Sequence, residues 1–132
     1  MSKVYVKTFI IKTYGPNKLF DITDKVEKIV EESRIENGVA TVFSHGSTGA
    51  IVRIKPEQAE EYSYVLWDLV PIDGWQHPGN AYAHLRSTII STKLALPLIG
   101  RKLVLGPARI YFVENQCYVA RERRITVAVE GE

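Results

Sequence analysis

The sequence predicts a single α+β domain over residues 1–132, with a largely antiparallel sheet and two amphipathic helices. The length of 132 residues is enough for one substantial hydrophobic core but short for two. Runs rich in β-branched and aromatic residues occupy both ends of the chain. Between them, two segments carry apolar residues at helical spacing. Strands at both ends around two amphipathic helices are typical of the α+β class.

The first expected elements are a strand and a helix. Residues 4–11 form a β-rich run with partial alternation of polar and apolar side chains, and Gly15-Pro16-Asn17 should form a turn. Thr23 is the expected N-cap of the helix, with Asp24 in the first turn, where negative charge is favoured. Asn37-Gly38 should end this helix in the left-handed C-cap conformation. Its apolar face comprises Val26, Ile29, Val30 and Ile35.

Two strands and a second helix follow. Residues 39–43 and 50–54 are rich in β-branched side chains and should form strands on either side of a Gly-rich loop. Pro56 suits the first turn of a helix, and Pro71 should end it. The apolar stripe of this helix includes Ala59, Tyr62, Leu66 and Leu69.

The last third of the chain contains short apolar runs. Residues 85–90 are ambiguous between a short helix and a strand. A strand over residues 94–96 should stop at Pro97. Further strands are expected at residues 103–105, 108–113 and 118–129.

Composition and charge exclude several classes of function. A net charge of +2 is too small to indicate nucleic-acid binding, and Glu122 and Glu130 interrupt the late cluster of arginines. The single Cys117 excludes an intrachain disulfide and a cysteine-based zinc cluster. No stretch approaches the roughly 20 apolar residues that a membrane span needs. We therefore expect a soluble, cytoplasmic protein with neither a nucleic-acid nor a membrane partner.

The stretch from Ile72 to Arg86 is the first candidate for a functional loop. Hydrophobic periodicity stops at Pro71 and resumes near Leu85, so a long irregular connection is expected. In compact domains such connections tend to be functional or disordered. Two aromatic and two imidazole side chains argue against disorder. We expect this connection to meet the Gly-rich loop at residues 45–49 in one pocket.

The loop Gly46-Ser47-Thr48-Gly49 is a candidate anion site. Its glycines let backbone N–H groups approach an anion closely, and its two hydroxyls add donors. It is not a P-loop, because no Gly-Lys-Ser/Thr follows and the next element is a strand rather than a helix. A hairpin connection whose small residues only serve the turn explains the same residues, so both interpretations stay open.

The three histidines of the chain, His45, His77 and His84, all fall in or beside loops. Three imidazoles with an open fourth position form a catalytic zinc arrangement, although this spacing matches no local ligand pattern. One histidine could instead act as a general acid or base near neutral pH, and ordinary surface hydrogen bonding is a third interpretation. Asp68 opposes the dipole of the second helix, which indicates either use at a site or simple exposure.

A family resemblance covers nearly the whole chain. The run Asn80-Ala81-Tyr82-Ala83-His84-Leu85-Arg86 resembles the N-a-x-a-H-L-[K/R] segment of the YjbQ-like family, small proteins often labelled secondary thiamine-phosphate synthases. The strand at residues 38–43, followed by His45 and a Gly-Ser-Thr loop, falls in the family's order. The other matching positions are Asp68 with Pro71, Gly100, Gly106 and the strand Arg121–Gly131.

The chain departs from the family pattern in two places. Many members carry His-Thr-Thr-Ala followed by a Glu, whereas this chain has His45-Gly46-Ser47-Thr48-Gly49-Ala50 and then Arg53. The family's Gly-Thr-Trp-Gln appears here as Gly106-Pro107-Ala108-Arg109.

The resemblance implies a β-sandwich-like subunit that assembles as a homotrimer, with its site near subunit contacts. It implies that His45, His77 and His84 are site residues able to hold zinc or another divalent metal, and it points to His84, His45 and Asp68 as candidate catalytic residues. Residues 46–49 and Arg86 would hold a small phosphorylated ligand. Thiamine-phosphate synthesis joins a pyrimidine methyl diphosphate to a thiazole phosphate and expels pyrophosphate, which usually requires a divalent ion such as magnesium.

Two functions remain open at this point. The first is an enzyme with secondary thiamine-phosphate synthase activity, that is, a transferase. The second is a non-catalytic trimeric protein that binds a metal or ligand, which the missing Glu and Trp-Gln positions favour. A structural trimer whose loops only pack the interface is a third interpretation.

Overall fold

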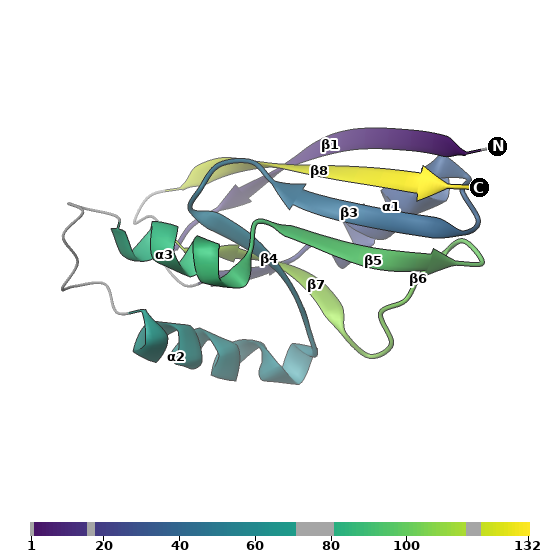
Figure 1. Ribbon diagram of the computed structural model, residues 1–132. Helices are drawn as coiled ribbons and strands as arrows, with labels where there is room; N and C mark the ends of the chain where they lie inside the picture. The colour runs from purple at the N-terminus through teal and green to yellow at the C-terminus, as the bar shows by residue number, and fades with distance from the viewer. Residues whose placement is uncertain (1, 16–17, 71–80, 116–119) are drawn as a thin grey trace.

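The computed structural model describes residues 2–15, 18–70, 81–115 and 120–132 (Figure 1). Two antiparallel sheets form the body of the molecule. The larger contains, in spatial order, β1 (Lys3–Thr13), β8 (Arg121–Gly131), β3 (Gly38–Ser44), β5 (Lys93–Ile99) and β6 (Lys102–Leu103). The smaller contains β2 (Lys18–Asp21), β7 (Arg109–Glu114) and β4 (Gly49–Ile54). The predicted α+β class with antiparallel sheets is therefore confirmed.

The described residues contain three α-helices in addition to the sheets. They are α1 (Thr23–Ser33), α2 (Ala59–Leu69), which follows a 3₁₀ turn at Pro56–Gln58, and α3 (Ala81–Ile90). The third resolves the ambiguity at residues 85–90 in favour of a helix. Helices α2 and α3 lie at one end of the molecule, whereas α1 packs behind the five-stranded sheet (Figure 1). In the part of the chain that the structure describes, no helix is long and apolar enough to cross a membrane.

One hydrophobic core fills the space between the two sheets and α1. Strand β8 shows why, because Ile125, Val127 and Val129 are fully buried at alternate positions while their neighbours face outward. Ile110 and Phe112 of β7 contribute from the other sheet, and the apolar face of α1 closes the third side. The same alternation turns the polar side chain of Arg123 in β8 toward the interior.

The ends of α1 differ from the sequence prediction. The helix begins at Thr23, whose N–H donates to Oδ1 of Asp21 at 3.0 Å. Asp21 therefore provides an acceptor, from outside the helix, for one N–H group of the first turn. The left-handed residue at the other end is Arg34, with φ of 58°, rather than Asn37 or Gly38. The prediction of an Asn37-Gly38 C-cap was wrong, because the chain leaves the helix earlier and Gly38 is the first residue of β3.

Strand β5 also differs from its prediction. It was expected to stop at Pro97, but it continues to Ile99 and pairs with β3 from Lys93 to Leu98. The ladder with β6 covers Leu98 and Ile99 and ends where the N–H of Val104 donates to the carbonyl of Pro97 at 3.0 Å, so Pro97 lies at the edge of that ladder. An edge position is one of the few places in a sheet that tolerates a residue without an N–H group.

The outer face of the five-stranded sheet is unusually apolar for a surface open to solvent. Residues directed away from the core on β1, β3 and β5 include Val4, Val6, Ile10, Val39, Phe43 and Ile99, each at least 40% exposed. An antiparallel sheet with one face in water normally places polar residues on that face. Apolar patches of this kind mark surfaces that bind another molecule. We refer to these six residues as the outer face.

An ion pair ties the start of α1 to β7. Arg109 donates from Nε to Oδ2 of Asp21 at 2.8 Å and from Nη2 to Oδ1 of Asp24 at 3.1 Å. Burial pushes the pKa of Asp21 upward, but hydrogen bonds from Arg109 and Thr23 outweigh it and hold that pKa below its ordinary value of 3.8. A carboxyl group whose pKa is lowered by folding adds stability above its unfolded pKa and loses it as the pH falls through the folded pKa.

Asp21→Asn should therefore lower the free energy of unfolding by about 1 kcal/mol at pH 7, a value limited by partial exposure of the pair to solvent. The difference from the wild type should shrink as the pH falls below 3.8 and through the lowered pKa of the folded protein, because the wild-type carboxyl group is then protonated too. Urea denaturation at pH 7 and pH 3 measures both values. Asp24→Asn is the matched control, since Asp24 is 89% exposed and should matter less at either pH. An equal loss at both pH values would contradict this account.

Candidate functional site

The loop between β3 and β4 is held at both ends by backbone hydrogen bonds. The N–H of His45 donates to the carbonyl of Arg124 at 3.1 Å, and the carbonyl of Thr48 accepts from the N–H of Asn115 at 3.2 Å. Among the described residues, the N–H groups of residues 46–48 donate to no other group. Consecutive N–H groups left in this way are characteristic of backbone anion sites.

Gly46 and Gly49 serve different purposes in this loop. Gly46 has φ of +89°, a left-handed conformation that other residues adopt at a cost. A Cβ atom at Gly49 would lie 2.3 Å from Cζ of the buried Phe112 ring. Gly49 is therefore a glycine because it packs against Phe112, while Gly46 allows the turn.

A buried ion pair lies directly beneath the loop. Arg123 donates from Nε to Oε1 of Glu114 at 2.7 Å and from Nη2 to Oε2 of the same carboxylate. The two side chains are 8% and 0% exposed. The hydroxyl of Thr13 donates to Glu114 at 2.6 Å, and Thr48 Oγ1 accepts from Nη2 of Arg123 at 2.8 Å. Such a satisfied network fixes the loop relative to three strands.

His45 lies on the opposite side of the sheet from Arg123. Its Nε2 is 2.6 Å from Oγ1 of Thr126, which is in turn 2.7 Å from Oγ1 of Thr8. The imidazole also meets the ring of Phe43 edge-on, with centroids 5.4 Å apart. His45 is exposed, so it occupies the border between the outer face and the loop.

Helix α3 is fastened close to this loop through Asn115. The side-chain amide of Asn115 donates to Oγ of Ser87 at 3.0 Å, while its backbone N–H binds the loop carbonyl of Thr48. The N–H of Ile51 in β4 donates to the carbonyl of Ser91, at the end of α3, at 3.1 Å. His84 is half-buried on the same helix, one turn before Ser87. The structure thus brings the loop, the end of β7 and α3 together.

The side chain of Arg86 is buried and contacts other groups of the protein. It is fully buried, and its Nε and Nη2 atoms donate to the carbonyl of Val70 at 2.9 and 2.7 Å. The guanidinium carbon also lies 5.3 Å from the centre of the Tyr82 ring. Arg86 therefore joins α3 to the residue that follows α2, and its role in ligand binding stays a prediction.

The predicted metal ligands are only partly within the described residues. His77 and the connection at residues 71–80 lie outside them, so the expected meeting of the two loops is untested. Within the described ranges, no group of three or more His, Cys, Asp and Glu side chains could hold a metal ion. His45 and His84 are each described, and a three-histidine site would need His77 as its third member. Asp68 is exposed on α2.

Sequence reasoning missed Glu114, Asn115 and Arg123 as residues of this region. Glu114 is a carboxylate directly after the strand predicted at residues 108–113, yet it is completely buried. The sequence did contain an indication of this, because alternate residues of a strand face the same side. Arg123 therefore faces the same side as the apolar residues 125, 127 and 129. An arginine on the inward-facing side of a strand needs a buried partner.

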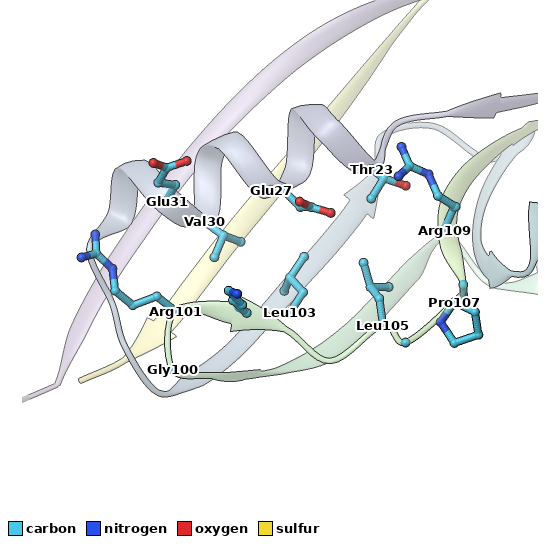
Figure 2. Close-up of a pocket in the computed structure, with 13 residues that line it drawn as sticks. Thr23, Glu27, Val30, Glu31, Gly100, Arg101, Leu103, Leu105, Pro107 and Arg109 are labelled. Carbon is cyan, nitrogen blue, oxygen red and sulfur yellow. The ribbon is translucent and has the colours of Figure 1, made fainter.

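A separate groove of about 910 Å³ lies between α1 and residues 100–109 (Figure 2). Val30, Leu103 and Leu105 line its floor, with Glu27 and Glu31 on the α1 side. None of the predicted site residues that the structure describes lines this groove. The region around the β3–β4 loop remains the candidate site, because the unpaired N–H groups and the buried ion pair are there.

Comparisons with known proteins agree with the fold. The family model described as "UPF0047 protein YjbQ-like" matches residues 7–132. A UPF0047 protein of Methanothermobacter thermautotrophicus is 33% identical over 98% of this chain and 94% of its own length. One from Archaeoglobus fulgidus is 33% identical over 89% of this chain and 94% of its own length.

Solved structures extend the comparison. A YbjQ-like protein of unknown function from Sulfolobus solfataricus P2 superposes with a TM-score of 0.92 at 34% identity, covering 100% of both chains. A hypothetical protein from Aeropyrum pernix K1 gives a TM-score of 0.87 at 30% identity, covering 96% of this chain and 98% of the other. The match of sequence and fold along the whole length leads to one conclusion: this chain belongs to the YjbQ-like family, UPF0047.

Proposed function

We propose that this protein binds a phosphorylated small molecule at the β3–β4 loop. The observation that carries the proposal is the set of unpaired N–H groups at residues 46–48, held in place by the buried pair beneath them. Phosphate oxygens accept from such groups without competing with the protein's own hydrogen bonds. The hydroxyl of Ser47, which is exposed, adds a donor at the same place.

A divalent metal is the second part of the proposal. His45, His77 and His84 would be its ligands, with zinc the ion most often bound by three imidazoles. The Nδ1 atom of His45 is not used by the contact of Nε2 with Thr126, so the imidazole keeps a nitrogen for an ion. A bound ion would neutralise charge on a phosphorylated substrate, and magnesium would serve this purpose in diphosphate transfer. If no ion binds there, His84, His45 and Asp68 are instead the candidate acid–base groups.

Metal content provides a direct test. Protein purified without a histidine tag should contain close to one zinc or similar ion per chain, and His84→Ala should lose it, because an imidazole ligand is removed. Mass spectrometry of the metals measures both. Tyr64→Ala, an exposed position on α2, is the control and should keep the ion. Absence of metal from every variant would rule out the histidine cluster.

The proposed reaction is the transfer that gives thiamine phosphate, as a secondary activity. The loop would hold the diphosphate that leaves, since donors placed at developing negative charge lower the barrier. The purified protein, at high concentration with magnesium and both substrates, should release pyrophosphate and form thiamine phosphate. Ser47→Ala should lower the rate while leaving the fold intact. No product from the wild type would exclude this reaction without excluding ligand binding.

A non-catalytic homotrimer that binds a metal or ligand is the second candidate. The observation that favours it is the position of Arg109, which replaces the last residue of the family's Gly-Thr-Trp-Gln. Its guanidinium is held by Asp21 and Asp24 and so serves the packing of α1. Arg53, where many members have a Glu, is exposed on β4. The outer face supplies an apolar surface through which subunits could assemble.

Self-assembly through the outer face has a measurable consequence. Val6→Asp should convert a trimer to monomers, because a carboxylate would be buried without a partner at the contact. Val65→Asp places the same change at a similarly exposed position on α2 and should leave the mass unchanged. Light scattering coupled to gel filtration measures the mass of each. A monomeric wild type, or a trimeric Val6→Asp variant, would contradict assembly through this face.

A further inference from the structure

We infer that Arg123 is the cationic residue of an oxyanion subsite, where its Nη1 atom and the N–H groups of residues 46–48 together bind one phosphate group. This inference rests on the proposed function and deepens it by naming the residue that supplies the charge and the ligand group that it recognises. The sequence analysis did not predict Arg123 as a site residue. It predicted Arg86, which donates instead to the carbonyl of Val70.

One nitrogen of the Arg123 side chain, Nη1, makes no hydrogen bond to a described residue. A guanidinium carries five N–H groups in a fixed plane, one on Nε and two on each Nη atom. Nε is used by Glu114, and Nη2 is shared between Glu114 and Thr48. Nη1 makes no hydrogen bond to any described residue, although the side chain is more than nine-tenths buried. Two charge-assisted donors are therefore left without a partner among the described residues.

Nη1 is directed at the loop. A Cβ atom built on Gly46 would meet a single atom within 4 Å, and that atom is Nη1 of Arg123, at 3.7 Å. The space in front of Gly46 is otherwise open. The unpaired N–H groups of residues 46–48 belong to the same short segment. Nη1 and the N–H groups of the loop therefore lie close together, as donors to one oxyanion must.

Glu114 positions this donor group. It binds the far side of the guanidinium through two oxygens, and Thr13 donates to the same carboxylate, so the plane of Arg123 is fixed before any ligand arrives. A fixed donor loses little conformational entropy on binding. The carboxylate also balances the charge of Arg123, so the subsite should select its ligand through the geometry of its donors more than through long-range attraction.

The ligand group that fits is a phosphate, either as a monoester or as one end of a diphosphate. Its tetrahedral oxygens can accept from Nη1 and from the N–H groups at the same time. A carboxylate is planar and has only two oxygens, so it should bind less tightly than phosphate. Inorganic phosphate and diphosphate are therefore suitable probes for the experiment, with acetate as the comparison.

The test is titration calorimetry of the full chain with inorganic phosphate, diphosphate and acetate. Arg123→Lys keeps a positive charge beside Glu114 but removes Nη1, and it should weaken phosphate binding about tenfold to a hundredfold, as expected for one or two lost charge-assisted hydrogen bonds. Arg124→Lys is the matched control, because the neighbouring arginine is exposed on the outer side of β8. It should bind phosphate as the wild type does.

A second variant separates binding from folding. Gly46→Ala keeps both Arg123 and Glu114, places a methyl group 3.7 Å from Nη1 and strains the left-handed backbone of the loop at φ of +89°. It should also weaken phosphate binding at least tenfold, and thermal unfolding of each variant shows that binding is measured on folded protein. Gly46→Ala decides the matter if Arg123→Lys does not fold.

The outcomes separate the two proposals. Phosphate binding in the wild type that persists in Arg123→Lys and Gly46→Ala would overturn the subsite and leave the proposed function standing. A wild type that binds neither phosphate nor diphosphate would overturn both. Weaker binding in both variants, with Arg124→Lys unaffected, would establish Arg123 as the anion-binding residue.

Discussion

Arg123→Met should lower the free energy of unfolding by about 3–5 kcal/mol, the cost of leaving a buried charge without its partner. Glu114 has no exposed surface, so water cannot replace the guanidinium in the variant. Thr13 would remain as a donor to the carboxylate, but a neutral hydroxyl does not balance a charge. Urea denaturation at pH 7 measures the loss.

Two further variants show that the loss comes from removing the guanidinium that balances the buried carboxylate. Arg124→Met removes an exposed arginine from the next position and should cost at most about 0.5 kcal/mol. Adding Glu114→Leu to Arg123→Met should recover a large part of the lost stability, because the pair is then replaced by apolar side chains. If the double variant is as unstable as the single one, shape rather than charge decides the stability of this region.

Gly38→Ala should cost at least about 3 kcal/mol, and the variant should accumulate as unfolded or aggregated protein. A Cβ atom at this position would lie 1.9 Å from the backbone carbonyl oxygen of Glu130 and 2.8 Å from Cα of Gly131. The obstructing atoms are backbone atoms of the paired strand β8, so no change of rotamer relieves the contact. The two strands would have to separate where β3 begins and β8 ends.

Gly100→Ala is the matched control for this substitution. Gly100 has φ of +58°, but a Cβ atom there would have no neighbour within 4 Å. Only the conformational cost of a left-handed alanine, about 1 kcal/mol, is expected. Thermal and urea unfolding of both variants compares the two effects. Equal stability of Gly38→Ala and Gly100→Ala would show that β3 and β8 can move apart at little cost.

The fold class and two of the helices could be predicted because their signals are local. The spacing of Val26, Ile29 and Val30 indicates a helix without reference to the rest of the chain, and Pro56 and Pro71 mark the limits of the next one. The order of short motifs along the chain was enough to indicate the family, which the comparisons confirm. The predicted C-cap at Gly38 failed because close strand approach explains that glycine better than helix termination.

The candidate site was predictable only in part. The Gly-Ser-Thr loop and His45 could be singled out from residue type, since glycines and hydroxyls have the same chemistry wherever they occur. Glu114 and Arg123 are nine residues apart and look like ordinary surface charges in the sequence. Their pairing depends on which face each strand turns to the core, and on β7 and β8 belonging to different sheets.

By itself the sequence determined the α+β class, the family and the loop at residues 45–49, because helical spacing, turn residues and motif order are properties of neighbouring residues. The tertiary structure decided the burial of Arg123 and Glu114, the use of Arg86 to bind Val70 and the direction of Nη1 toward Gly46. The physical reason is that burial and hydrogen bonding depend on strand register and on packing between sheets. Those contacts join residues far apart in the chain.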